Sequence, residues 1–354
     1  MRIGRSLGAT GAALTALVAS PISAQVATPA PPPVAGAKAA TVERITVHGR
    51  ALEGSLEGDS ADRTVLVVLP PSYGASPRRR YPVVYALHGY SIGAEQWTRE
   101  IHVPQTIEGA FAQGAREMIV VLPDSKTAHN GSMYSSSVTT GDYETFVARD
   151  LVAYVDSHYR TVADRASRGL AGHSMGGYGT ARIGIKHPEV FGALYMMSPC
   201  CLAARTPGRD AAADEKAVAA LRSPADSATL SWNQRAQLAA AAAWSPNPAR
   251  PPLFLDLPTE GGQPRPGVVA RWAANAPLAM LDQYVGNLRR YRAIGLDVGD
   301  RDGLKEDAQA LHAALDRYGI RHAFAVYPGD HVSGVATRVQ EQVIPFFSRA
   351  LVFP

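Results

Sequence analysis

Runs of five to seven mostly apolar residues recur along the chain, and most end in glycine, proline or polar residues. The clearest runs cover residues 82–87, 117–123, 191–197 and 292–298. A strand that is covered by helices on both faces has this continuous apolar character. Two earlier segments, 43–48 and 63–69, instead alternate apolar and polar residues, which predicts antiparallel strands that begin the sheet.

Helical patterns lie between these strands. Residues 142–159 and 304–318 carry apolar residues at helical spacing, and a third helix is predicted from residue 175 to 187, ahead of Pro188. The residue before a proline is disfavoured in the α region, so this helix should stop there. Alternation of strands and helices without internal repeats predicts an α/β fold, in which helices flank a mostly parallel central sheet.

Residues 203–285 interrupt this alternation, just before the strand at 292–298. Alanine-rich segments at 218–221 and 235–244 predict short helices, residues 245–252 a proline-rich hinge, and residues 253–257 a strand. A connection of this length is too long for an ordinary loop, so we interpret it as an insertion. Whether it caps a site or only decorates the domain stays open.

The N-terminus has the pattern of an export signal. Arg2 and Arg5 precede a short alanine-rich apolar run at 7–18, which is too short to span a bilayer, and residues 22–24 form a small-residue cleavage site. We therefore predict a signal peptide at 1–24 and a periplasmic or secreted protein. Residues 25–40, rich in Ala and Pro, are expected to form a tether without packing contacts, and residues 41–354 the folded domain.

Composition and charge exclude some classes of function. The chain has 354 residues, 46% of them hydrophobic and 19% charged, which is typical of a globular domain. Its formal charge of +4 would fall to +2 without Arg2 and Arg5, too small a charge to indicate nucleic-acid binding. Cys200 and Cys201 are adjacent and are expected to be small buried apolar residues, and no Cys or His spacing indicates a metal site.

The most informative motif is Gly172-His173-Ser174-Met175-Gly176, between a short predicted strand and a predicted helix. In a G-x-S-x-G nucleophile elbow, a sharp turn raises the serine hydroxyl above the sheet, and glycines avoid clashes with the backbone. The helix that follows directs its N–H groups and positive dipole end toward that hydroxyl. The motif therefore predicts Ser174 as a nucleophile.

Two backbone donors for an oxyanion are predicted near Ser174. One is the N–H of Met175, directly after the nucleophile, and the other is that of Tyr90, in the loop that follows the strand at 82–87. His88 in that loop is interpreted as a hydrogen-bonded structural residue.

The loop at 124–141 either lines the pocket or is a plain surface loop. Three residues are candidates for substrate binding: His173, Trp97 and Tyr134.

A serine nucleophile needs a histidine base and a carboxylate that orients it. In nucleophile-elbow enzymes these follow the serine in the order acid, then histidine. The turn after the strand at 292–298 holds Asp300 and Asp302; we choose Asp302 as the acid, and Asp300 remains the alternative. His331 follows the last predicted strand, 324–327, and is the predicted base, whereas His312 and His322 are interpreted as structural.

These motifs resemble the esterase D family of α/β-hydrolases, which includes feruloyl and acetyl-xylan esterases and S-formylglutathione hydrolases. The resemblance rests on residues 69–73, 81–89, 156–161, 172–177 and 345–347. It implies the α/β-hydrolase fold, a triad of Ser174, Asp302 and His331, and no cofactor. The family's G-x-x-D pattern favours Asp302 over Asp300. The insertion and the export signal argue against a cytosolic formylglutathione substrate.

The function predicted from the sequence is therefore that of a secreted serine carboxylesterase. Its substrate would be a small-molecule ester or an ester linked to a polysaccharide. An acyltransferase that excludes water, or a binding module without catalysis on the same scaffold, is the alternative.

Overall fold

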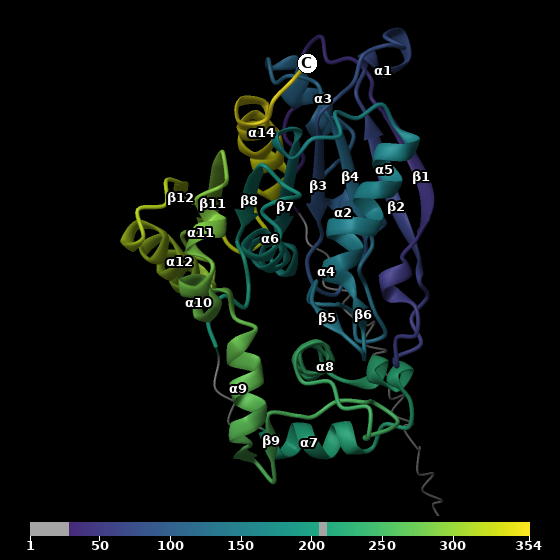
Figure 1. Ribbon diagram of the computed structural model, residues 1–354, viewed down its shortest axis with the longest axis vertical. Helices are drawn as coiled ribbons and strands as arrows, with labels where there is room; N and C mark the ends of the chain where they lie inside the picture. The colour runs from purple at the N-terminus through teal and green to yellow at the C-terminus, as the bar shows by residue number, and fades with distance from the viewer. Residues whose placement is uncertain (1–27, 205–210) are drawn as a thin grey trace, which may run out of the picture.

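An eight-stranded sheet organises the molecule, in the order β1-β2-β4-β3-β7-β8-β11-β12 (Figure 1). The computed structural model describes residues 28–204 and 211–354. The strands are β1 (Thr41–His48), β2 (Asp62–Leu69), β3 (Val83–Leu87), β4 (Ile119–Pro123), β7 (Arg168–His173), β8 (Ala193–Met197), β11 (Ala293–Gly299) and β12 (Ala323–Tyr327). β1 pairs antiparallel with β2, and β2 with β4. The other strands follow in the order β4-β3-β7-β8-β11-β12, and each of these six runs parallel to its neighbours in this series. The prediction of a mostly parallel sheet is confirmed.

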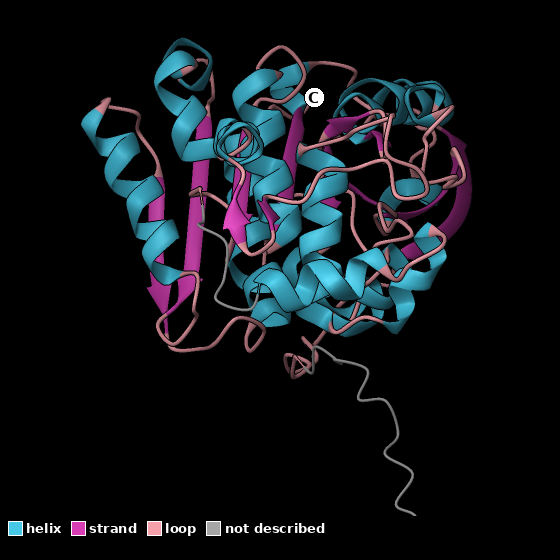
Figure 2. Cartoon of the chain, turned by 90° about the horizontal axis from the view of Figure 1, so that it is seen from below, coloured by secondary structure: helices cyan, strands magenta, loops and turns pink. Residues whose placement is uncertain are grey.

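Both faces of the sheet are buried under helices (Figure 2). Along β3, Val83, Tyr85 and Leu87 belong to one apolar cluster, and Val84 and Ala86 belong to a second cluster on the other face. Successive side chains of a strand point to opposite faces, which explains why this strand is apolar throughout. The first cluster includes side chains from α5 (Leu151–His158), α6 (Met175–Lys186) and α12 (Lys305–Arg317), and the second from α2 (Ala94–Glu100), α3 (Gln105–Ala112) and α14 (Ile344–Ala350).

The predicted helices form, with small differences at their ends. The segment 142–159 contains α4 (Tyr143–Thr145), a π-helical stretch (Phe146–Asp150) and α5. α6 ends at Lys186, before Pro188 as expected. α2 and α3 form in a segment for which the sequence predicts no helix. Among the helices of the described residues, none combines the length and apolar character needed to cross a bilayer.

The insertion has a small apolar cluster of its own. Its elements are α7 (Ala211–Ala219), a 3-10 helix (Pro224–Thr229), α8 (Trp232–Trp244), the hairpin β9 (Thr259–Glu260) and β10 (Gln263–Pro264), α9 (Pro266–Ala274) and α10 (Pro277–Met280). The strand predicted at 253–257 is wrong, since Leu255 makes only an isolated bridge to Pro246. Leu253 and Leu255 are apolar because they pack with Leu238 in the cluster of the insertion. Of the predicted helix at 218–221, only Val218 and Ala219 are helical, as the end of α7.

The insertion lies at one end of the molecule, beside β5 (Ser136–Ser137) and β6 (Gly141–Asp142) (Figure 1). The Ser137 hydroxyl donates to the carbonyl of Ala242 in α8 at 2.5 Å. A second bond joins the guanidinium of Arg235 to the carbonyl of Ala128 at 2.7 Å. The insertion is therefore anchored to the loop at 124–141.

The predicted signal peptide at 1–24 and the first residues of the predicted tether lie outside the described residues. The rest of the tether differs from the expectation, because part of it packs on the domain. Thr28 is buried, and its carbonyl accepts a hydrogen bond from His102 at 2.9 Å. The Gln105 side chain donates to the carbonyl of Pro31 at 2.7 Å. These contacts hold residues 28–31 against the helices on one face of the sheet.

Candidate active site

Ser174 occupies the turn between β7 and α6 and has an unusual backbone conformation. Its φ of 58° and ψ of −115° are rare for a residue with a side chain. A Cβ atom on Gly172 would clash with the carbonyl of Gly176, and one on Gly176 would clash with the carbonyl of Leu87. The strand, the turn and the helix thus approach so closely that only glycine fits on either side of the serine.

Ser174, His331 and Asp302 form a continuous hydrogen-bonded series. The Ser174 hydroxyl oxygen lies 2.9 Å from Nε2 of His331, and Nδ1 of the same ring lies 2.9 Å from Oδ2 of Asp302. The other Asp302 oxygen accepts the N–H of Leu304 at 2.9 Å. Burial opposes ionisation of Asp302, but these hydrogen bonds and the nearby His331 outweigh it and lower its pKa. Asp302 is therefore a carboxylate that accepts from the His331 ring.

The structure distinguishes the two aspartates that the sequence left as alternatives. Asp300 is partly exposed, and its carboxylate accepts the backbone N–H of Gly329 at 2.8 Å. It therefore braces the loop that carries His331 but does not contact the imidazole. His312 and His322 hydrogen bond to each other at 2.8 Å, and it is His331 that contacts Ser174.

The two predicted oxyanion donors belong to two segments that meet at Ser174. A Cβ on Gly89 would lie 3.4 Å from the Ser174 Cβ, so the loop after β3 passes directly beside the serine. The side chains of Tyr90 and Met175 both lie against Gly131. None of the hydrogen bonds within the described residues uses the backbone N–H of Tyr90 or Met175. Both N–H groups therefore have no protein acceptor among the described residues, and Met175 is the first residue of helix α6, whose dipole is positive at this end.

His88 holds the loop that carries Tyr90. Its Nε2 accepts the backbone N–H of Ser125 at 2.9 Å, so the proton is on Nδ1, which donates to the carbonyl of Gly89 at 2.8 Å. Burial lowers the pKa of His88 and keeps the ring neutral. The interpretation of His88 as a hydrogen-bonded structural residue is confirmed.

The three residues predicted to bind substrate need correction. His173, Trp97 and Tyr134 are at most 3% exposed and offer no surface to a ligand. The His173 ring donates from Nε2 to the carbonyl of His331 at 2.8 Å, and burial together with the nearby His331 lowers its pKa to about 3. The Tyr134 hydroxyl donates to the carbonyl of His88 at 3.1 Å. These two side chains hydrogen bond to the backbone beside the site, and Trp97, in α2, belongs to the core cluster on one face of the sheet.

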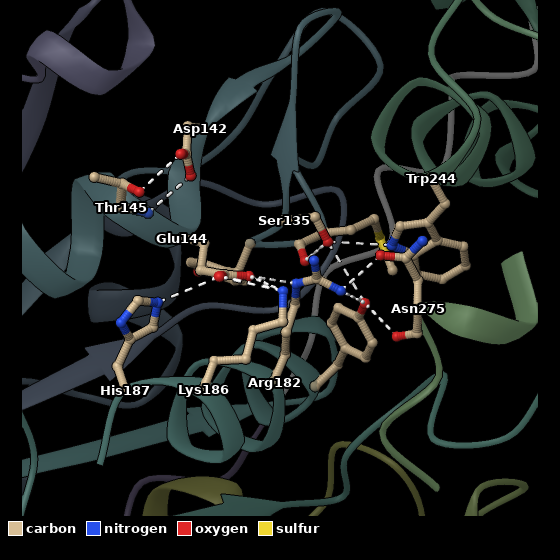
Figure 3. Close-up of polar contacts among 12 residues, drawn as sticks. Ser135, Asp142, Glu144, Thr145, Arg182, Lys186, His187, Trp244 and Asn275 are labelled. Carbon is tan, nitrogen blue, oxygen red and sulfur yellow. Dashed lines mark hydrogen bonds and ion pairs between the residues drawn. The ribbon is translucent and has the colours of Figure 1, made fainter. Parts of the chain in front are cut away.

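A polar network that the sequence analysis missed connects the elbow helix α6 to the insertion (Figure 3). The guanidinium of Arg182 in α6 donates to Glu144 at 2.7 Å and to the side-chain oxygen of Asn275, after α9, at 2.7 Å. Although burial opposes it, hydrogen bonds and charge from His187, Arg182 and Lys186 lower the pKa of Glu144 to about 2. No local motif signals this network, because its members come from distant segments.

Trp232 is a second feature that the sequence analysis did not single out. It is the first residue of α8, its side chain is 56% exposed, and its ring meets the ring of Tyr90 edge to face with centroids 5.2 Å apart. The insertion therefore presents an exposed aromatic ring beside a residue of the candidate site. The local signal for the position of Trp232 is the capping box of Ser231 and Gln234, which starts α8 at this residue.

The two cysteines do not form a disulfide, and Cys200 contacts the serine. Both follow β8 and are half-buried, whereas the sequence predicted buried residues. The backbone N–H of Cys200 donates to the Ser174 carbonyl at 3.1 Å. This bond helps to fix the strained backbone of the elbow.

Comparison with known proteins identifies the family of the chain. The model of a family described as "Putative esterase" matches residues 60–334. An endo-1,4-beta-xylanase/feruloyl esterase of Xylanibacter ruminicola is 29% identical over 159 residues, which are 43% of this chain and 22% of that protein. An esterase of Mycobacterium tuberculosis is 31% identical over 126 residues, 35% of this chain and 26% of that protein. The chain thus spans about a quarter of the length of these relatives.

Solved structures share the whole fold. A ferulic acid esterase superimposes with a TM-score of 0.63 at 23% identity, over 88% of this chain and 99% of that one. An S-formylglutathione hydrolase from Staphylococcus aureus superimposes with a TM-score of 0.57 at 15% identity, over 88% of this chain and 99% of that one. At these identities the similarity establishes the fold, which is that of the α/β-hydrolases.

Proposed function

This chain belongs to the esterase family whose model it matches over residues 60–334, and we propose that it is a serine carboxylesterase. Ser174 is the nucleophile, His331 the general base and Asp302 the carboxylate that orients the base. The observation that carries the proposal is the unbroken series of hydrogen bonds through these three residues at a strained strand-to-helix turn. Nucleophile, base and orienting carboxylate within hydrogen-bond reach are what covalent ester hydrolysis requires.

The reaction follows from the positions of the atoms. His331 Nε2 takes the proton of the Ser174 hydroxyl as its oxygen attacks the ester carbonyl carbon. Asp302 stabilises the imidazolium that forms and keeps the ring in the correct tautomer. His331 then gives the proton to the leaving alcohol, and an acyl group remains on Ser174. Water activated by the same imidazole hydrolyses this acyl-enzyme and restores the serine.

The backbone N–H groups of Tyr90 and Met175 would hold the oxyanion of each tetrahedral intermediate. Their lack of other hydrogen-bond partners within the described residues supports this role. The hydrogen bonds of His88 and Tyr134 fix the Tyr90 loop before substrate arrives. Donors that are already oriented stabilise developing charge without a cost of reorganisation during the reaction.

The substrate we propose is an ester of an aromatic acid, attached to a polysaccharide. Two observations support this choice. The exposed ring of Trp232 packs against the half-buried ring of Tyr90 beside the site, and aromatic rings bind other aromatic rings in stacked or edge-to-face arrangements. One relative is named for both xylanase and feruloyl esterase activities.

Export to the periplasm or the medium is also part of the proposal. The basic start, the apolar run and the small-residue cleavage site within residues 1–24 support it. N-terminal sequencing of the protein recovered outside the cytoplasm should begin at Gln25. A mature chain that begins at Met1 would contradict export by this signal.

The experiment that tests the function compares the wild type with Ser174→Ala. Substrates are p-nitrophenyl esters of increasing chain length, methyl ferulate and an acetylated xylan. The wild type should hydrolyse methyl ferulate, and the variant should lose turnover by a factor on the order of 10⁴ or more. Circular dichroism and the thermal midpoint should show that the variant is folded.

Two results would change the proposal. Substantial activity in Ser174→Ala would move the nucleophile elsewhere. If the wild type hydrolyses no ester, an added sugar or alcohol acceptor tests the acyltransferase, since the product would then be a new ester instead of an acid.

A further inference from the structure

Three potential metal ligands meet where α12 turns back into β12. His312 and Asp316 are one helical turn apart in α12, so they lie on the same side of the helix. Gly319, with a φ of 63°, reverses the chain after the helix and brings His322 back beside them. This convergence is not visible in the sequence, where no metal-ligand spacing was recognised.

The donor atoms are close together. Nδ1 of His312 lies 2.8 Å from Nε2 of His322. The carboxylate of Asp316 lies 3.6 Å from Nε2 of His312 and 4.0 Å from Nδ1 of His322, which is the other nitrogen of each ring. One donor atom from each of the three residues can be chosen so that all lie within 4.8 Å of one another.

Neighbouring groups hold both rings in place. Nδ1 of His322 donates to the carbonyl of Ile320 at 2.8 Å, which leaves the lone pair of Nε2 directed at His312. The His312 ring stacks on Phe324, with centroids 4.4 Å apart and an angle of 19° between the planes. In many metal sites the second ring nitrogen of a ligating histidine donates to a backbone carbonyl in the same way, which fixes the tautomer.

We propose that His312, Asp316 and His322 bind a divalent transition metal ion, with Zn²⁺ as the best match. Two imidazoles and one carboxylate suit zinc, whereas Ca²⁺ and Mg²⁺ prefer oxygen ligands. Water would complete a tetrahedral site. His312 would carry its proton on Nε2, so that the two nitrogens that face each other both coordinate the ion.

To hold zinc, the two rings must separate and the Asp316 carboxylate must rotate toward the two nitrogens that face each other. Two nitrogens bound to a tetrahedral Zn²⁺ lie about 3.4 Å apart, so the two rings must separate by about 0.6 Å. The His322 side chain is 2% exposed and stays fixed, whereas Asp316 is 63% exposed and free to move toward the ion. The buried histidine would anchor the site, and the two helical ligands would close on it.

The role we assign to the metal is structural. His322 precedes β12, and His331 follows it, so the metal site and the catalytic base lie at opposite ends of this strand. β12 is the last strand of the sheet, and within the described part of the chain it pairs with β11 alone. A metal that joins α12 to the start of β12 would therefore stabilise the edge of the domain without contact with the reacting atoms.

The test uses the full protein freed of metal with a chelator. Zn²⁺ affinity is measured by competition with a chromogenic zinc chelator, and stability by the thermal midpoint with Zn²⁺ or Mg²⁺. The wild type should bind one Zn²⁺ per chain, and Zn²⁺ but not Mg²⁺ should raise its midpoint. His322→Ala should weaken Zn²⁺ binding at least about tenfold. Should that buried change prevent folding, the more exposed His312→Ala gives the same comparison.

His48 provides a matched control. It is exposed, and its two ring nitrogens contact the carboxylates of Glu53 and Asp62, each at 2.7 Å, so this cluster lacks the pair of facing imidazoles on which the proposed site depends. His48→Ala should bind Zn²⁺ as tightly as the wild type. The proposal is overturned if the wild type binds no Zn²⁺, or if both His312→Ala and His322→Ala bind it with unchanged affinity. None of these readouts depends on ester hydrolysis.

Discussion

Nδ1 of His331 lies 2.9 Å from Oδ2 of Asp302, although 29 positions separate the two residues in the chain. They meet because β11 and β12 are neighbouring parallel strands whose last residues, Gly299 and Tyr327, are paired in register. Each residue lies in the loop directly after its strand. The parallel arrangement therefore brings an acid and a base from two loops to the same edge of the sheet.

The first prediction separates the two aspartates. Asp302→Asn removes the negative charge that stabilises the imidazolium and should reduce kcat on the order of 10⁴-fold. Asp300→Asn should keep most activity, because an amide oxygen can still accept the N–H of Gly329. Steady-state kinetics of both purified variants on one ester gives the comparison. Equal losses in the two variants would remove the distinction between them.

A second prediction concerns the elbow. Gly176→Ala places a methyl group against the carbonyl of Leu87, where the rigid backbone of β3 cannot move aside. The expected loss in the free energy of unfolding is about 3 kcal/mol or more. Gly267→Ala in α9 is the control, since a Cβ there meets nothing within 4 Å. Urea unfolding measures both, and a Gly176→Ala protein as stable as the control would contradict the steric account.

The third prediction tests the aromatic pair. Trp232→Ala should raise KM for methyl ferulate about 2- to 12-fold with little change in kcat, because an aromatic contact contributes about 0.5–1.5 kcal/mol. KM for p-nitrophenyl acetate, which has a small acyl group, should change less. Val138→Ala removes another exposed apolar side chain and should have no effect. An unchanged KM for methyl ferulate in Trp232→Ala would exclude this residue from substrate binding.

The fourth prediction concerns acid stability and His88. The Ser125 N–H points at Nε2 of the ring, so a proton there would break that hydrogen bond, and burial lowers the pKa of His88 below 6.5. Below pH 6.5 the unfolded chain therefore binds a proton that the folded chain does not, and stability must fall as the pH falls. One such group contributes a slope of at most about 1.4 kcal/mol per pH unit.

The measurement is the free energy of unfolding between pH 4 and pH 7. His88→Gln cannot take up this proton, so its stability should depend less steeply on pH than that of the wild type. His158→Gln, which changes an exposed histidine at the end of α5, should keep the slope of the wild type. Identical slopes for His88→Gln and the wild type would show that another group controls acid stability.

Local patterns predicted the core strands and the elbow because their causes are local. A strand such as β3 that is buried on both faces must be apolar at every position, and a helix must end before Pro188. The insertion was harder to predict. Leu253 and Leu255 have the apolar alternation of a strand, yet no strand forms there, and their side chains pack in an apolar cluster with α8. An apolar residue signals burial, but it does not show which element buries it.

The sequence by itself determined the α/β fold and singled out Ser174 and His331 as candidate nucleophile and base. The sharp turn requires glycines on either side of the serine, and the order of the strands places the histidine in the loop after the last strand. Only the tertiary structure decided that Asp302, and not Asp300, faces the imidazole. It also decided that His173, Trp97 and Tyr134 are buried, and that His312, Asp316 and His322 converge. The physical reason is that side-chain direction and burial depend on packing between segments that are distant in the chain.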